Sequence, residues 1–447
     1  MGIFDFILFP FYVIVFYFLF DTRRKKYNNP ILQHYHKIGF WIRVMSAFAF
    51  SIFNVYISRG DSIGLYYTEG VNIYNLILKD SSHLKWIFLP GSEFDQSLLR
   101  NPLNQGYFRA ENNYMVTRLV TVFSFFSLGK YLILNLVFSM VAYSGVWRLY
   151  RFFYEQYPHL HKQLAIAILY LPTFVFWSSG ILKDSICISA LGWLTYSLNE
   201  LFYKKKNLIT NLCIIALAGY MLSVLKVYIL VSYLPFFFLF LVLKNMSLLK
   251  SKFAKVFIVL GLVFVSMVLF TKIMGTLTES LGEYAAGGLT KSMEKKQQAY
   301  TIREANSSFS LGVDLSSGIT MSKLALVAPA AIIATLYRPF IWESRNVSTL
   351  LSSFESLFIM FFTLSVLFKH GIRHFITTAT KDPAVIYCIS FSLLFALFVG
   401  ATTSNFGSLV RYKIPCMPFY VIAIFLIQDA ARQKKENLLK NKQVVNV

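Results

Sequence analysis

Apolar runs of about 16 to 22 residues, separated by short polar segments, organise almost the whole sequence. An α-helix rises about 1.5 Å per residue, so roughly 20 apolar residues cross the hydrocarbon core of a bilayer, which is about 30 Å thick. Hydrophobic residues make up 56% of the 447 residues and charged residues only 14%. The runs do not alternate between polar and apolar residues, as barrel strands would. We therefore expect an all-α, polytopic membrane protein that forms a single integral membrane domain over residues 1–447.

The formal net charge of +22 is the second constraint. In a soluble protein such a charge would indicate nucleic-acid binding. Here the basic residues cluster in short segments between apolar runs, such as "DTRRKKYNN" and "FYKKKN". Lysine and arginine in short loops stay on the cytoplasmic side of a membrane, so the charge reflects topology. We expect no nucleic-acid partner.

No cofactor or metal motif is present in the sequence. Nothing resembles HExxH, a P-loop or GxGxxG. The four cysteines lie in or beside apolar runs without paired spacing, which is typical of small core residues. These residues are Cys187, Cys213, Cys388 and Cys416. We therefore expect no bound cofactor and no metal site.

The positive-inside rule predicts the topology. Basic residues follow the first apolar run, so the N-terminus is expected outside, and the basic tail 429–447 is expected in the cytoplasm. Long outer loops are expected at 59–115 and 276–321. About eleven spans are predicted, at 3–20, 38–58, 131–153, 163–178, 185–203, 208–223, 227–243, 256–275, 347–368, 383–400 and 416–428.

Two further apolar segments, 116–128 and 322–337, do not fit this count. A full span at either place would move the basic loops that follow it to the outer side of the membrane, against the positive-inside rule. We interpret both as interfacial or re-entrant helices on the outer face, which are tolerated where protein or a watery cavity surrounds them. The alternative, in which both span the membrane, remains open.

Charged residues also gather at the predicted outer ends of spans. In "FWSSGILKDSI", Lys183 and Asp184 lie between two apolar runs, although a charge inside a bilayer is costly. Because guanidinium and ammonium groups bind phosphate oxygens, we expect the basic members to hold the phosphate of a lipid. The expected phosphate ligands are Lys183, Lys226, Arg338, Arg411 and Lys413, and the expected supporting residues are Arg109, Glu111, Asp184 and Glu343. The alternative is that each turn simply presents its charges to water.

Asp61 opens the first outer loop, directly after a predicted span. A carboxylate at this place is suited to general-base catalysis, because it can take the proton from an attacking hydroxyl group. The alternative is that Asp61 caps the helix that follows, with its carboxylate on free backbone N–H groups.

The layout resembles that of the GT-C-type polytopic membrane glycosyltransferases and related bacterial polysaccharide-assembly membrane proteins. The segments that carry the resemblance are "RGDSIGLYYTEG", "ENNYMVTRLVTVFSFFSLGKY", "PTFVFWSSGILKD" and "RYKIPCMPF". It implies a polyprenyl-phosphate-linked sugar donor on the outer face of the bacterial cytoplasmic membrane, with Asp61 as general base and Arg411 at the lipid phosphate. The first loop lacks the acidic pair of metal-dependent members, so a divalent metal is not supported.

The expected function is therefore transfer of a sugar or oligosaccharide from a polyprenyl-linked donor to an acceptor on the outer face. The expected partners are the lipid-linked donor and membrane lipids. A polysaccharide polymerase that uses the same displacement is the first alternative. A flippase or transporter of lipid-linked sugars, which is not an enzyme of this kind, is the second. Convergence of the outer charges would favour the enzymes, whereas dispersal would favour unrelated turns.

Overall fold

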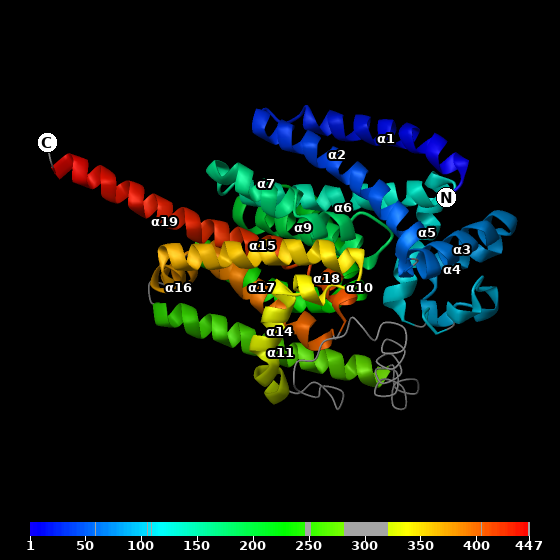
Figure 1. Cartoon of the computed structure of the whole chain (residues 1–447). Coiled ribbons are helices and arrows are strands. Elements are labelled where there is room, and N and C mark those ends of the chain that lie inside the picture. The colour runs from blue at the N-terminus through cyan, green and yellow to red at the C-terminus, as the bar shows by residue number, and fades with distance from the viewer. Residues whose placement is uncertain are drawn as a thin grey trace. The chain divides into compact units, whose positions relative to one another are not determined.

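The computed structural model describes residues 1–58, 60–104, 106–108, 110–245, 252–280, 321–403 and 405–445. The described residues form α-helices with short 3-10 and π-helical segments and include no β-strand (Figure 1). The expected all-α class is thus confirmed. The chain divides into two compact units, Met1–Val227 and Tyr228–Val447, and each is described by itself below.

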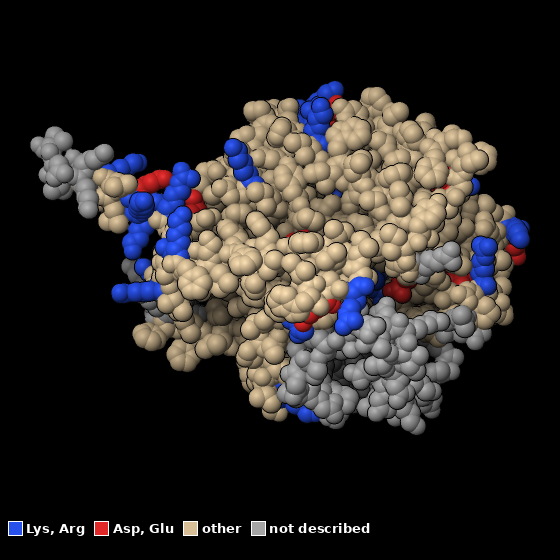
Figure 2. Space-filling view, viewed as in Figure 1, with Lys and Arg blue, Asp and Glu red and all other residues tan. Residues whose placement is uncertain are grey.

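Six of the described helices are long and apolar enough to cross a bilayer, and a bent pair of helices, Phe406–Tyr412 with Met417–Asn441, would make seven. In the view of Figure 2 most of the described surface belongs to uncharged residues. Both findings are compatible with a multi-pass membrane protein, but the count of about eleven spans is not confirmed. The six helices are Ile3–Arg24, Pro30–Ser58, Tyr131–Tyr154, Leu208–Lys244, Val347–His370 and Pro383–Thr402.

The first unit is built around helix α6. Its elements are α1 (Ile3–Arg24), α2 (Pro30–Phe53), η1 (Asn54–Ser58), η2 (Ser62–Tyr67), α3 (Thr68–Lys79), η3 (Ser81–Leu84), α4 (Lys85–Phe88), η4 (Gly91–Glu93), η5 (Gln96–Leu98), η6 (Pro102–Asn104), α5 (Glu111–Ser127), α6 (Tyr131–Tyr154), η7 (Pro158–Leu160), α7 (His161–Leu169), α8 (Pro172–Trp177), α9 (Lys183–Asn199), η8 (Glu200–Lys204) and the start of α10 (Leu208–Asn245). Helices α2 and α9 both pack along α6.

Glycines set the close approach of α6 and α9. A Cβ atom on Gly145 would lie 2.1 Å from the carbonyl oxygen of Ser189, and one on Gly192 would lie 2.0 Å from the carbonyl oxygen of Gly145. Small residues of this kind let helix backbones approach each other where lipid offers no hydrophobic drive for association. The two glycines therefore fix the register of α9 on α6.

Hydrogen bonds between the helices give their directions. Along α9, Ser189, Trp193 and Tyr196 bond in turn to Val141, Ser144 and Arg151 of α6, so the two helices are parallel. Helix α2 runs antiparallel to α6, since its residues 36, 43 and 51 bond in turn to residues 143, 139 and 135.

Helices α7 and α8 follow α2 and therefore run against α9. His161 of α7 bonds to Tyr35, and Val175 of α8 accepts from Ser46, further along α2. The chain thus reverses at residues 178–182, where the hairpin was predicted. The predicted span 163–178 is broken near Pro172, because proline lacks an N–H group and starts a new helix. Neither α7 nor α8 is long enough to be a span by itself.

The predicted outer loop 59–115 is folded. An aromatic cluster of Trp86, Phe94, Phe108 and Tyr114 forms its buried centre, with ring centroids 5.1–5.6 Å apart. The buried carboxylate of Glu69 accepts hydrogen bonds from the backbone N–H groups of residues 100 and 101 and from the side chain of residue 104. The aromatic cluster and the bonds of Glu69 therefore fix the backbone that carries the polar residues of this segment.

The second unit begins within α10. The helical backbone of α10 is interrupted at Lys226, with φ −153° and ψ 75°, inside the turn predicted between 223 and 227. The other elements are α11 (Lys252–Ser280), α14 (Met321–Tyr337), η9 (Ile341–Glu343), α15 (Val347–His370), α16 (Ile372–Lys381), α17 (Pro383–Thr402), α18 (Phe406–Tyr412) and α19 (Met417–Val445). Most of the predicted loop 276–321 lies outside the described residues.

Helix α14 packs closely on α17. The carbonyl oxygen of Ala331 lies 2.4 Å from the position of a Cβ atom on Gly400, and Thr335 donates a hydrogen bond across the interface to the carbonyl of Ala396 at 2.8 Å. Helices α14 and α5 cover the two apolar segments predicted to be interfacial or re-entrant, and each has 17 residues. Both are shorter than a helix that crosses a bilayer upright.

We predict that Gly145→Ala destabilises the protein, because the added methyl group meets the backbone of α9 and cannot be accommodated by rotation of a side chain. Overpacking of this kind costs about 1–3 kcal/mol. Gly219→Ala is the matched control, since nothing lies within 4 Å of its Cβ position. The measurement is the apparent melting temperature of each purified variant in detergent. Equal melting temperatures for both variants would contradict the close α6–α9 contact.

Candidate functional site

Asp61 lies between two π-helical segments. Helix η1 ends at Ser58 and η2 begins at Ser62, and π-helical turns are frequent at functional sites. The Asp61 side chain is exposed and, although the residue occupies the N-cap position of η2, it makes no capping hydrogen bond. The alternative interpretation of Asp61 as a helix cap is therefore wrong.

The first turn of α5 brings the Asp61 segment and Lys183 to one place. Asn113 of that turn accepts a hydrogen bond from Tyr66 of η2 at 3.3 Å. The adjacent Asn112 accepts one from the Nζ atom of Lys183 at 2.9 Å. Tyr66 and Lys183, which are more than 100 positions apart in the sequence, thus bond to neighbouring residues of α5 in the first unit.

Asp184 and Lys226 form a buried ion pair. The Nζ atom of Lys226 lies 2.6 Å from a carboxylate oxygen of Asp184, and the two side chains are 6% and 0% exposed. A buried charge is stable only with such a partner and with further hydrogen bonds. The ammonium of Lys226 is engaged by Asp184 in this structure, so Lys226 contacts a phosphate only by sharing or exchanging that partner.

The turn 178–182 that presents Lys183 is buried and held from two helices. Arg43 of α2 donates from Nη1 to Ser178 Oγ at 2.6 Å and to the carbonyl of Val175 at 3.4 Å. Asn135 of α6 accepts from the backbone N–H of Ile181 at 2.9 Å. Non-helical backbone is tolerated at membrane depth only where protein satisfies its polar groups. Arg43 also donates to the carbonyl of Ser178 at 3.3 Å, so both side chains bond to backbone groups of the turn.

Neither Arg43 nor Asn135 was among the residues selected from the sequence. A signal for Arg43 exists, because a cation in the middle of an apolar run is costly and therefore has a role. Asn135 gives a weaker signal, since a single amide near the end of a span is common. Their target, an internal turn 135 or more residues away from Arg43, is not visible in the sequence.

Glu111 stabilises the folded loop. It forms an ion pair with Arg118 at 3.0 Å and accepts a hydrogen bond from the backbone N–H of Gly91 at 2.8 Å. Arg118 in turn stacks on Tyr114, where burial raises the pKa of the phenol. The geometry thus gives Glu111 a structural task close to the Lys183 contact. Arg109 lies outside the described residues.

The predicted residues of the second unit also meet. Arg338 forms a bidentate ion pair with Glu343, with Nε 3.0 Å from both carboxylate oxygens. Lys413, which is 1% exposed, donates to the carbonyl of Arg338 at 3.0 Å and to Ser356 Oγ at 2.8 Å. These contacts join α15, the end of α14 and the residue after α18. Arg338, Glu343 and Lys413 are therefore neighbours.

Lys413 is an unusual buried cation. Among the described residues it forms no ion pair within 4.0 Å, and Glu355, also buried, interacts with it only at longer range. Helix α15 offers it a polar buried face, which sequence reasoning missed because the residues lie in an apparently apolar span. That face consists of Thr349, Ser352, Ser353, Glu355 and Ser356.

Arg411 lies on α18, the short helix that ends one residue before Lys413. Its side chain is half-buried, and its guanidinium carbon lies 5.7 Å from the centroid of the Tyr412 ring. Stacking of this kind leaves the edge of a guanidinium available for hydrogen bonds. Arg411 and Lys413 are thus presented from the same bend between α18 and α19.

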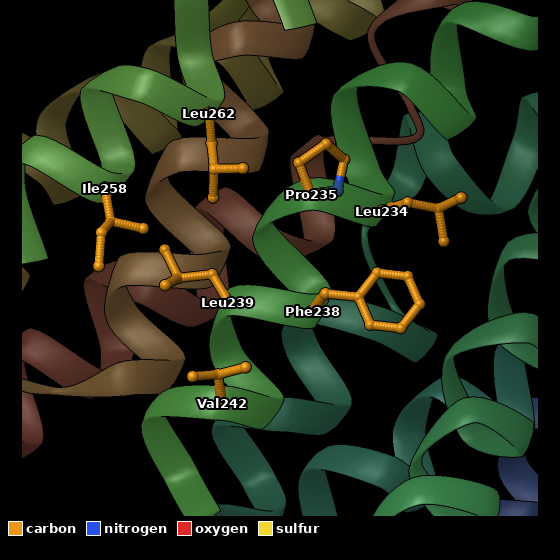
Figure 3. Close-up of a pocket in the computed structure, with 7 residues that line it drawn as sticks. All are labelled: Leu234, Pro235, Phe238, Leu239, Val242, Ile258 and Leu262. Atoms are coloured by element: carbon orange, nitrogen blue, oxygen red, sulfur yellow. The ribbon is translucent and has the colours of Figure 1, made fainter. Parts of the chain in front are cut away.

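A groove of about 460 Å³ lies between α10 and α11 in the second unit (Figure 3). Every residue that lines it is apolar, and Pro235 and Phe238 contribute from α10 while Ile258 contributes from α11. A surface of this kind holds hydrocarbon but performs no chemistry. Within the described parts of the chain, no group of three or more His, Cys, Asp or Glu residues has the arrangement of a metal site.

No protein-family model, curated protein or solved structure matches the chain.

We predict that the ion pair of Asp184 and Lys226 governs folding more than chemistry. Asp184→Asn leaves a buried ammonium without its charge partner, which costs about 3–5 kcal/mol. Lys226→Met leaves a buried carboxylate unpaired, with a similar loss. The double variant removes both charges and is expected to recover much of the lost abundance. The measurement is the amount of folded protein in the membrane for each variant. Strictly additive losses in the double variant would show that the pair is not coupled.

Proposed function

We propose that the protein is a membrane glycosyltransferase. It moves a sugar or oligosaccharide from a polyprenyl-phosphate-linked donor to an acceptor on the outer face of a bacterial cytoplasmic membrane. The observation that carries the proposal is that η2, which directly follows Asp61, and Lys183 both bond to the first turn of α5, while Asp184, next to Lys183, pairs with Lys226. An exposed acid and a half-buried amine beside a membrane-embedded bundle suit a charged, lipid-anchored substrate.

The proposed reaction is an inverting displacement. Asp61 accepts the proton of the acceptor hydroxyl group as the hydroxyl oxygen attacks the anomeric carbon of the donor sugar. The bond between that carbon and the phosphate oxygen breaks, and its electron pair leaves with the lipid phosphate. Positive side chains stabilise the charge that develops on the leaving phosphate. The proton then passes from Asp61 to water.

Lys183 is the proposed phosphate ligand of the first unit. It stands at the N-terminus of α9, which has no side-chain cap, and a helix N-terminus favours an anion. Asp184 has a different proposed task, which is to hold Lys226 and the break in α10. In the second unit, Arg411 and Lys413 are proposed phosphate ligands, and Glu343 orients Arg338.

The groove between α10 and α11 supports a substrate with a hydrocarbon tail. Its seven lining residues, shown in Figure 3, carry no polar side chain. A polyprenyl chain is apolar along its length and, within a bilayer, can pack against such a surface through van der Waals contacts. The groove is compatible with the lipid moiety of the donor and gives no information on its sugar.

Two other functions use the same features. A polysaccharide polymerase would transfer a longer glycan by the same displacement, and the proposed roles of Asp61 and the cations would be unchanged. A flippase would need charged groups along a path through the bilayer. Arg43 is buried at the centre of α2, but its hydrogen bonds to the turn 178–182 give it a structural task. This favours an enzyme.

We predict that Asp61→Asn lowers turnover by about 10²–10⁴-fold at normal protein abundance, as expected for loss of a general base. The folded state should tolerate the change, because Asp61 is exposed and caps no helix. Asp80→Asn is the matched control. Asp80 is an exposed acid of the same outer segment, and asparagine preserves its cap on Ser82. The measurement is lipid-linked sugar in cell extracts, normalised to the amount of protein in the membrane.

The location of the accumulated lipid separates the candidate functions. A failing transferase or polymerase leaves its donor on the outer face, where an impermeant lectin binds it, and a failing flippase leaves it on the inner face. Normal turnover of Asp61→Asn would remove the proposed base and, with it, the transferase mechanism.

The proposed topology has the N-terminus outside, the C-terminus in the cytoplasm and about eleven spans. We predict that a cysteine at Ser81, exposed in η3, reacts with an impermeant thiol reagent in intact cells. A cysteine at Asn207, exposed after η8, should react only in opened cells. Both belong in a background without native cysteines, because Cys213 is exposed. The reverse pattern would place Asp61 and Lys183 on the wrong side for an outer-face reaction.

A further inference from the structure

A second cluster lies at the other end of α6, about 20 residues from the end that neighbours Lys183. It contains Arg148 and Arg151 of α6, Trp193 and Tyr196 of α9, and Tyr27, which follows α1. All five residues belong to the first unit. The proposed transferase reaction uses none of them. By the positive-inside rule, this end is the cytoplasmic one.

Arg148 is held between two aromatic rings. Its guanidinium carbon lies 4.3 Å from the centroid of the Trp193 ring and 4.8 Å from that of Tyr196. Trp193 is itself fixed, because its Nε1–H donates to Ser144 Oγ at 2.9 Å. In the described part of the chain, Arg148 donates no hydrogen bond and pairs with no carboxylate. The rings therefore position a guanidinium whose N–H groups are unused.

The nearby carboxylates are committed to other cations. Glu155 pairs with Arg151 at 2.9 Å through one oxygen and with Lys204 at 2.5 Å through the other. Glu200 pairs with Lys204 at 2.6 Å. Among these described groups three cations thus face two carboxylates. Arg148 is the cation that remains without a counter-charge.

Further positive charge surrounds this cation. Arg151 and the exposed Arg23 both act on Arg148 as like charges. The Nε atom of Arg151 is buried and has no hydrogen-bond partner among the described residues. Binding of an anion stabilises a site where like positive charges lie close together and N–H donors have no partner.

The geometry points to a phosphate. A guanidinium stacked on aromatic faces presents its N–H groups at its edge, where two of them match two oxygens of one phosphate. Tyrosine and tryptophan beside a cation at the end of a spanning helix mark the level of the lipid headgroups. Exposed Phe202 and Tyr203 of η8 lie next to Lys204 in the sequence and offer apolar contact for acyl chains.

We propose that Arg148, clamped between Trp193 and Tyr196, binds the phosphate of an anionic phospholipid headgroup. The site is separate from the proposed reaction, and it does not depend on the transferase assignment. Its role is to anchor the α6–α9 pair to one leaflet. A basic residue near an anionic membrane surface contributes about 1 kcal/mol, which corresponds to roughly a fivefold change in affinity.

The test is native mass spectrometry of the full chain, released from detergent that contains either phosphatidylglycerol or phosphatidylcholine. The natural sequence is expected to retain phosphatidylglycerol preferentially. Arg148→Gln should lower that retention about fivefold, and Arg148→Lys should lower it less, because lysine keeps the charge without the bidentate fork. Lys206→Gln is the matched control, since Lys206 is an exposed cation after η8 that is not one of the charges acting on Arg148.

Three results would overturn the proposal. Equal retention by the natural sequence and Arg148→Gln would remove the site. Equal losses in Lys206→Gln and Arg148→Gln would show attraction by general charge only. Displacement of the lipid by millimolar inorganic phosphate would show that the site takes a free anion. Arg148→Lys keeps the test valid if Arg148→Gln fails to fold.

Discussion

The anchoring of the turn at 178–182 is the interaction on which the first unit depends. Five consecutive buried residues are non-helical between α8 and α9, and a bilayer supplies no water to satisfy their backbone groups. Arg43 donates to the carbonyl of Ser178 and Asn135 accepts from the backbone N–H of Ile181, so two different helices supply partners to the turn. The turn can then reverse the chain inside the protein and still set Lys183 against α5. Without those partners the same apolar sequence would favour a continuous helix, and Lys183 would then lie at another depth.

The buried ion pair of Asp184 and Lys226 is a second case in which a buried polar group is satisfied by a partner from another helix. A lysine in an apolar helix is expensive, and so is an aspartate at the start of a buried one. Each makes the other tolerable, and the pair ties the N-terminus of α9 to the break in α10. In the second unit the buried ammonium of Lys413 is bound by uncharged groups, a backbone carbonyl and a serine hydroxyl. Such an ammonium keeps more of its charge uncompensated than one bound to a carboxylate.

Some of these features could be predicted from the sequence because they depend on neighbouring residues, and others could not because they depend on distant ones. The helical class, the turn before Lys183 and the break at Lys226 follow from local information, since runs of apolar residues and isolated charges are visible in a short window, whereas the break at Pro172 was not predicted. The count of spans does not follow, because an apolar run such as 163–178 reads as one span in the sequence but is broken into α7 and α8, each too short to cross a bilayer. The partners of Arg43, Asp184 and Lys413 are also non-local. In helices that are apolar on all sides, the pattern does not reveal which face meets which neighbour.

Close contact between α6 and α9 connects the two ends of the first unit. Lys183 and Trp193 are separated by about 15 Å along α9, since ten residues rise by about 1.5 Å each. Gly145 and Gly192 fix the register of α9 on α6 between these positions. A shift of α9 by one turn would move Lys183 away from Asn112 and, at the same time, move Trp193 and Tyr196 away from Arg148. The position of the proposed phosphate ligand Lys183 and that of the aromatic clamp on Arg148 therefore depend on the same packing of two helices.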